Sequence, residues 1–109
     1  KVSDIMSYNK LVRDKIPEII KNNNETPVTR ILSDEEYKIE LEKKLLEEYY
    51  EVIETTGKNR LEELADMLEV MIALANLEKA TLEDIMTIAD EKRNKRGGFK
   101  EKIFLESVK

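Results

Sequence analysis

The sequence predicts an all-α fold with an antiparallel four-helix arrangement, in which two acidic helices, 34-56 and 59-78, lie at the centre. The chain has 109 residues, enough for one domain with a modest core, and we expect 1-109 to form a single domain. It has only three Gly and two Pro, and 39% of its residues are charged. This composition suits helices better than a β-sandwich. Apolar residues recur at helical spacing, and the predicted connections are short, as between antiparallel neighbours.

The chain contains neither Cys nor His, and this excludes several kinds of site. Without His there is no Ser-His-Asp triad, no usual zinc site and no Glu-x-x-His di-iron site. Without Cys there is no disulfide framework, which permits a cytoplasmic location. The net charge of -5 argues against a general phosphate-backbone binder, and no apolar run approaches the roughly 20 residues of a membrane span. We therefore expect no nucleic-acid polymer and no membrane as partner.

The first predicted helix begins near Pro17, a residue suited to a first helical turn. Asp14 is a candidate cap, and the helix is expected to end in the run Asn22–Asn24. We expect Lys1–Ile5 to be residues that remain from cloning and Met6 to be the natural start, so these residues are left out of the reasoning about the fold.

A β-branched, Pro-bounded connector leads from this helix to the first acidic helix. Its residues 28-32 are a candidate short strand that would pair with 102-106 near the C-terminus. Ser33 or Asp34 is expected to cap the acidic helix that follows. Gly57 is expected to break the chain between the two acidic helices.

The last predicted helix, 82-96, has Thr81 as its N-cap and ends at Gly97-Gly98. Three cations prolong the rows of its apolar face: Lys92, Arg93 and Arg96. Either they meet substrate phosphates, or they only satisfy the helix dipole, which favours cations at a C-terminus. Lys10 and Arg13 precede the first helix. They either contact a phosphate group or belong to a solvated basic turn.

Each central helix carries two carboxylates three residues apart: Glu48 with Glu51, and Glu63 with Asp66. Such spacing puts both members on one helical face. Among 24 acidic residues it also arises by chance, so a solvated acidic face is the alternative. However, Glu48 stands on an apolar stripe formed by Leu41, Leu45 and Val52.

A carboxylate on such a stripe needs a partner, because burying it unpaired costs on the order of several kcal/mol. Four carboxylates between two antiparallel helices therefore predict a divalent metal site. Their hard oxygen ligands favour Mg²⁺, with Mn²⁺ as a substitute.

The run Glu47-Glu48-x-x-Glu51 followed by Glu63-x-x-Asp66 resembles the EExxE…ExxD signature of the MazG-like all-α nucleoside triphosphate pyrophosphohydrolases. That superfamily also contains the phosphoribosyl-ATP pyrophosphohydrolases. The resemblance extends from about Tyr8 to the C-terminus, because two flanking segments are similar to the ends of a compact MazG-like subgroup: Tyr8–Pro17 and Arg96–Phe99.

This resemblance implies a helical homodimer or homotetramer that uses Mg²⁺ to hydrolyse the α–β phosphoanhydride of a nucleotide. The positions that match the metal ligands are Glu48, Glu51, Glu63 and Asp66. Glu47 matches the acid that would orient or deprotonate the attacking water. Lys44 either pairs with Glu48 or touches a phosphate.

We expect a noncanonical nucleoside triphosphate as substrate, and phosphoribosyl-ATP is the alternative with the same chemistry. A non-catalytic helical interaction module, with solvated or paired carboxylates, is the alternative of another class.

Overall fold

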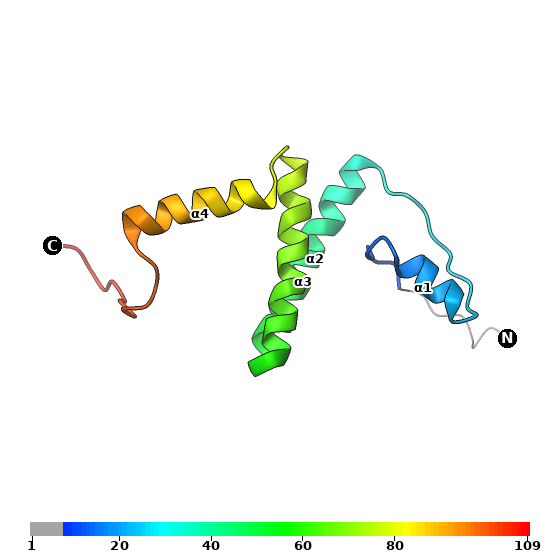
Figure 1. Ribbon diagram of the computed structural model, residues 1–109, viewed down its shortest axis with the longest axis horizontal. Coiled ribbons are helices and arrows are strands. Elements are labelled where there is room, and N and C mark those ends of the chain that lie inside the picture. Colours follow the sequence, from blue (N-terminus) through cyan, green and yellow to red (C-terminus); the bar gives the residue numbers. More distant parts are fainter. Residues whose placement is uncertain (1–7) are drawn as a thin grey trace. The chain divides into compact units, whose positions relative to one another are not determined.

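The computed structural model describes residues 8–109 and is all-helical over this range. Its four helices are α1 (Ile16–Asn22), α2 (Asp34–Glu54), α3 (Gly57–Leu77) and α4 (Leu82–Arg96) (Figure 1). The predicted fold class is confirmed, and α2 and α3 are the two acidic helices. The interpretation of Lys1–Ile5 concerns residues outside the described range. Over residues 8–109, no helix combines the length and the apolar character needed to cross a membrane.

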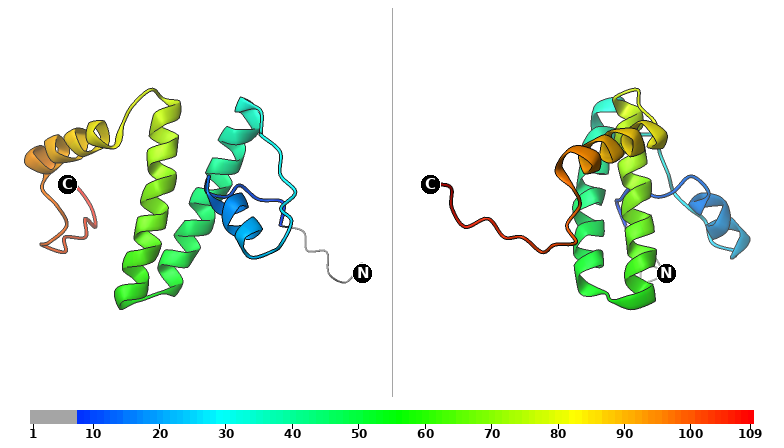
Figure 2. Two further views of the ribbon diagram at one scale, coloured as in Figure 1. Left: turned by 45° about the vertical axis from the view of Figure 1, so that its right-hand side comes forward. Right: turned by 60° about the vertical axis from the view of Figure 1, so that its left-hand side comes forward.

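Contacts divide the chain into two compact units, Lys1–Leu74 and Ala75–Lys109. The first unit contains α1, α2 and most of α3. In it, α2 and α3 run antiparallel and side by side, joined by the short connection at Thr55 and Thr56 (Figure 2). Leu41 of α2 is 3% exposed and Val70 of α3 is 6% exposed. They are the two buried apolar residues of the described chain, so its core is very small.

Two capping boxes fix the starts of α2 and α4, and Ser33 and Thr81 are the N-caps that the sequence predicts. The Ser33 hydroxyl accepts a hydrogen bond from the backbone N–H of Glu36 at 3.2 Å, and the Glu36 carboxylate accepts one from the backbone N–H of Ser33 at 3.2 Å. Thr81 and Asp84 form the same reciprocal pair at 3.3 and 2.8 Å. Each box satisfies backbone donors that have no partner inside the helix. At its other end α4 stops at Gly97, whose φ of 82° suits glycine.

Two predicted boundaries differ from the structure. Asp14 does not cap α1, because Lys15 is the N-cap residue and no side chain bonds the free N–H groups there. Gly57 does not separate the acidic helices but is the first residue of α3, with φ of 60°. Thr55 and Thr56 form the break instead. The extended backbone of Thr55, with φ of −117° and ψ of 160°, ends α2, and its hydroxyl donates to the carbonyl of Glu51 at 2.9 Å.

The predicted strand pairing of 28-32 with 102-106 is wrong, since residues 8–109 contain no strand. Val28 and Ile31 lie in irregular backbone and are each 96% exposed, so β-branched side chains alone do not create a strand without a partner edge. Near the C-terminus, Lys102 has φ of 59°, which interrupts the extended conformation that a strand at 102-106 requires.

Candidate functional site

The first unit contains a cleft of about 670 Å³ between the N-terminal segment, α2 and α3. The N-terminal segment forms one wall with residues from Lys10 to Ile16, and the inward faces of α2 and α3 form the others. Eight of the predicted site residues line this cleft: Lys10, Arg13, Lys44, Glu47, Glu48, Glu51, Glu63 and Asp66. Residues up to 56 positions apart in the sequence are thus brought to one concave site, where ligands are usually bound.

Three carboxylates form the most compact group in this cleft. Glu48 of α2 and the pair Glu63 and Asp66 of α3 each offer one oxygen, and these oxygens lie within 4.8 Å of one another. Glu48 is only 8% exposed, while the other two are half-buried. The antiparallel pairing of α2 and α3 therefore brings Glu48, one member of the α2 pair, next to both members of the α3 pair.

The cluster carries unfavourable charge at neutral pH. Burial raises the pKa of Glu48, and the nearby Asp66 carboxylate raises it further, while Lys44 partly opposes both effects. Partial burial also raises the pKa of Glu63, with added repulsion from Glu51 and Asp66. Both shifts mean that the charged carboxylates lack full compensation. A cation in the cluster would supply it.

Glu51 and Glu47 stand apart from these three. Glu51 lines the cleft and repels Glu63, but it is not one of the three carboxylates whose oxygens lie within 4.8 Å of one another. Glu47 is exposed, and its carboxylate lies 3.8 Å from the Lys44 ammonium. The sequence left open whether Lys44 pairs with Glu48, and the ion pair is instead with Glu47.

Among the described residues, Arg13 is the cation that forms an ion pair with a member of the cluster. Its Nη2 donates to Oδ1 of Asp66 at 2.7 Å, and the two side chains are 55% and 45% exposed. Arg13 belongs to the segment before α1, so the bond connects this segment to α3. Sequence reasoning assigned both residues to the site but did not predict that they pair.

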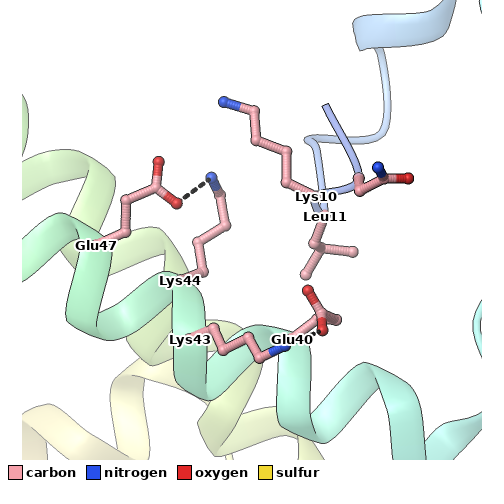
Figure 3. Close-up of a pocket in the computed structure, with 7 residues that line it drawn as sticks. Lys10, Leu11, Glu40, Lys43, Lys44 and Glu47 are labelled. Atoms are coloured by element: carbon pink, nitrogen blue, oxygen red, sulfur yellow. Dashed lines mark hydrogen bonds and ion pairs between the residues drawn. The ribbon is translucent and has the colours of Figure 1, made fainter. Parts of the chain in front are cut away.

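A second, smaller hollow of about 180 Å³ adjoins the lysines of the site. Lys10, Leu11, Lys44 and Glu47 line both it and the larger cleft. In Figure 3, Lys10 extends from the N-terminal segment, while Lys44 on the facing helix reaches toward Glu47. Lys43 bonds Glu40 at 3.0 Å on the floor of this hollow. Lys43 and Lys44 are thus paired with Glu40 and Glu47, and no ion pair is found for Lys10 among the described residues.

The remaining predicted cations belong to the second unit. Lys92, Arg93 and Arg96 lie in the last turns of α4, where all three are exposed. Arg93 bonds Asp90 one turn earlier, at 3.3 Å. Their contact with substrate stays a prediction, and the dipole of α4 already accounts for cations at its C-terminus.

Glu69 and Tyr37 are among the lining residues of the cleft that sequence reasoning did not assign to the site. Glu69 lines the cleft, and it continues the three-residue spacing of Glu63 and Asp66, a signal that would have found it. Tyr37 lines it too, one turn before Leu41 on the stripe of α2. The polar lining of the site therefore extends beyond the predicted residues by about two turns along α2, to Tyr37, and by about one turn along α3, to Glu69.

The donor set of the cluster fits a hard divalent cation. Carboxylate oxygens are the ligands that Mg²⁺ and Mn²⁺ prefer, and Mg²⁺ is typically held by one or two carboxylates together with waters and phosphates. Mutual repulsion within the cluster, and the guanidinium already bonded to Asp66, both indicate a preference for positive charge at this point. Glu48, Glu63 and Asp66 are thus the residues that would hold such an ion.

Comparisons with known proteins add one relative. Over 42 residues, or 38% of this chain, the sequence is 55% identical to an uncharacterized protein of Mycolicibacterium smegmatis. The match covers 43% of that protein, so this chain spans less than half of its relative's length. No protein-family model and no solved structure matches the chain.

Proposed function

We propose that this chain is a Mg²⁺-dependent nucleotide pyrophosphohydrolase that cleaves the α–β phosphoanhydride of a nucleoside triphosphate. The observation that carries the proposal is one cleft in which three clustered carboxylates, Glu48, Glu63 and Asp66, lie beside cationic side chains. A polyphosphate substrate needs both kinds of group. The carboxylates would hold a metal ion, and the metal ion and the positive side chains together neutralise the negative oxygens of the phosphates. The motif spacing and both flanking segments agree with the MazG-like resemblance.

In the proposed reaction, water bonds to the α-phosphorus while the bond from that phosphorus to the bridging oxygen breaks, which yields a nucleoside monophosphate and pyrophosphate. Mg²⁺, when bound, would neutralise the phosphates and polarise the reacting centre. Glu47 is assigned to orient the attacking water and accept its proton. Lys10 and Lys44, which line both hollows, are assigned to the phosphates. Glu51 is retained as a further metal ligand from the motif.

Noncanonical nucleoside triphosphates are the proposed substrates, which would place the reaction with the cytoplasmic nucleotide pool. The test is pyrophosphate release from a panel of nucleoside triphosphates and phosphoribosyl-ATP, with Mg²⁺ and with a chelator. We expect metal-dependent release from wild type and none from Glu48→Gln or Asp66→Asn. Glu42→Gln is the matched control, because Glu42 is an exposed residue of α2 that does not line the cleft.

Absence of release from every substrate, together with no effect of Mg²⁺ on thermal unfolding, would reject the proposal in favour of a helical interaction module. Retained turnover in both site variants would reject the metal site while leaving the reaction open to other residues.

We further propose that the chain works as a homo-oligomer, with a homodimer as the simplest form. Besides its inward stripe, α2 carries a second apolar stripe of exposed side chains at helical spacing: Ile39, Leu46, Tyr50 and Ile53. On α3, the exposed apolar row is Leu61, Leu64, Leu68 and Met71. A helix that is apolar on opposite faces is normally covered on both, and contiguous patches above a few hundred Å² mark association surfaces.

The apolar part of α4 is too short to cover both rows. It runs from Leu82 to Ala89, eight residues or about 12 Å of helix. The α2 row from Ile39 to Ile53 alone extends over about 21 Å. A second copy would supply a matching surface by two-fold symmetry. Light scattering should give a multiple of the chain mass for wild type and for Lys38→Glu, but the monomer mass for Leu46→Glu. An unchanged mass for Leu46→Glu would contradict this surface.

A further inference from the structure

The ion pair between Arg13 and Asp66 differs from every other ion pair of the described residues. Its partners are 53 positions apart, whereas the remaining pairs join residues at most six positions apart. It joins the segment before α1 to α3, directly at the acidic cluster. The bond therefore links two elements of the fold. It also engages one of the three carboxylates of the candidate metal site.

The Arg13 guanidinium and a divalent cation would thus compete for the carboxylate of Asp66. Its Oδ1 accepts from the guanidinium at 2.7 Å, and one of its oxygens also lies within 4.8 Å of the ligand oxygens of Glu48 and Glu63. A divalent ion held by those oxygens and a guanidinium on Asp66 would be neighbouring positive charges, which repel. The side chains of Arg13 and Asp66 are also both about half-exposed, so water can replace their hydrogen bond at little cost in free energy.

We propose that Arg13 is exchanged between two acceptors. It pairs with Asp66 in the absence of a divalent cation, and it moves to a phosphate group of the substrate when the cation takes Asp66. This inference rests on the proposed function, because it assumes the metal and a phosphate-bearing ligand. Arg13 already lines the cleft, and a guanidinium binds phosphate oxygens in the same forked geometry as carboxylates.

The alternative role for Arg13 is to orient Asp66 toward the metal, as outer-shell partners often do. The two roles predict opposite signs. If Arg13 competes with the cation, its removal strengthens metal binding. If Arg13 orients Asp66, its removal weakens metal binding.

The experiment is calorimetric titration of the full chain with Mn²⁺, in the absence of nucleotide and at fixed protein concentration. For Arg13→Gln we expect binding about threefold to fivefold tighter than wild type, the range that an exposed ion pair provides. Arg30→Gln is the matched control. It removes one positive charge of the same unit from another exposed ion pair, with Glu36 at 2.9 Å, and Arg30 does not line the cleft. The control should stay within about twofold of wild type.

A second titration uses a non-hydrolysable α,β-methylene triphosphate. With Mn²⁺ present, Arg13→Gln should bind it about tenfold more weakly than wild type, because a charge-assisted bond to phosphate is lost. Without Mn²⁺ the two proteins should differ by less than about twofold, since Arg13 then pairs with Asp66. Arg13→Lys, which keeps the charge and guards against a folding defect, should lie between them in Mn²⁺ affinity.

The outcomes separate this inference from the proposed function. Equal or weaker Mn²⁺ binding by Arg13→Gln, with wild type binding normally, overturns the exchange and leaves the metal site intact. Loss of analogue affinity that is the same with and without Mn²⁺ also overturns it. Failure of wild type to bind Mn²⁺ overturns both.

Discussion

Replacing Glu48 by Gln gives the sharpest prediction, because this residue is only 8% exposed and its carboxylate, whose oxygens stay accessible, makes no hydrogen bond or ion pair with residues 8–109. Its oxygens approach those of Asp66 to within 4.8 Å. Two like charges at that distance repel by about 1 kcal/mol in a water-like dielectric and by about 3.5 kcal/mol at an effective dielectric of 20. Asp66 is half-exposed and bonded to Arg13, so the lower figure applies.

We therefore expect Glu48→Gln to raise the metal-free free energy of unfolding by about 1 kcal/mol at pH 7. For a domain of this size, that corresponds to a melting temperature about 4–8 °C higher. The same variant should lose most of the stabilisation by Mg²⁺. Wild type should gain about 2.7 kcal/mol when Mg²⁺ is present at one hundred times its Kd.

Thermal unfolding followed by circular dichroism, with chelator and with Mg²⁺, measures both effects at one protein concentration. Glu42→Gln, on the exposed face of the same helix, controls for loss of one negative charge. A lower metal-free stability for Glu48→Gln would mean that Glu48 has an attractive partner, and the reasoning from repulsion would be refuted. Undiminished Mg²⁺ stabilisation in this variant would remove Glu48 from the metal site.

Three further predictions follow from single features. The pKa values of Glu48 and Glu63 are raised on folding, so the metal-free native state binds protons more readily than the unfolded chain, and its stability should rise as pH falls from 7 toward 5. The pKa of Glu36 is lowered to about 2, so its contribution to stability is lost as pH falls below 4.5. Urea unfolding across pH 2–7 should therefore show a maximum of the free energy of unfolding between these two pH ranges. A free energy of unfolding that does not change with pH would contradict the prediction. Ser33→Ala should lower the free energy of unfolding by about 1 kcal/mol through loss of the α2 cap, and no change would show that the cap is dispensable. Leu46→Glu should raise the monomer fraction in sedimentation experiments, and an undiminished oligomer would exclude the α2 row as the contact.

Local chemistry made much of this fold predictable. Ser33 and Thr81 cap their helices as expected, and each forms a capping box with the acid three residues later. The position of Glu48 on an apolar stripe indicated a carboxylate at the helix contact, and the structure has it buried. These features depend on residues within one or two turns of each other, so periodicity is enough to find them.

Features that depend on distant partners were not predictable in the same way. Val28 and Ile31 have the side chains of a strand but no neighbouring edge, so their propensity is not expressed. The bond from Arg13 to Asp66 bridges 53 positions and depends on the path of the segment before α1, which periodicity does not describe. Glu51 illustrates a finer limit. Its spacing from Glu48 matches that of Asp66 from Glu63, yet only Asp66 joins the compact cluster.

The small core connects stability to function and leads to a final prediction. Leu41 and Val70 are the two buried apolar side chains in residues 8–109, and between the same helices lies a repulsive carboxylate cluster. A core of this size provides little of the roughly 5–15 kcal/mol that stabilises typical domains. The proposed cation and the proposed association of copies would both add to it, and both act by mass action.

The melting temperature of wild type should therefore rise with Mg²⁺ and, independently, with protein concentration. Leu46→Glu should lose the concentration dependence and keep the response to Mg²⁺, whereas Glu48→Gln should do the reverse. This crossed pattern distinguishes two separate surfaces of α2, one for the cation and one for a second copy. Loss of both responses in either variant would mean that the metal site is complete only in the oligomer, and the two faces would then act as one site.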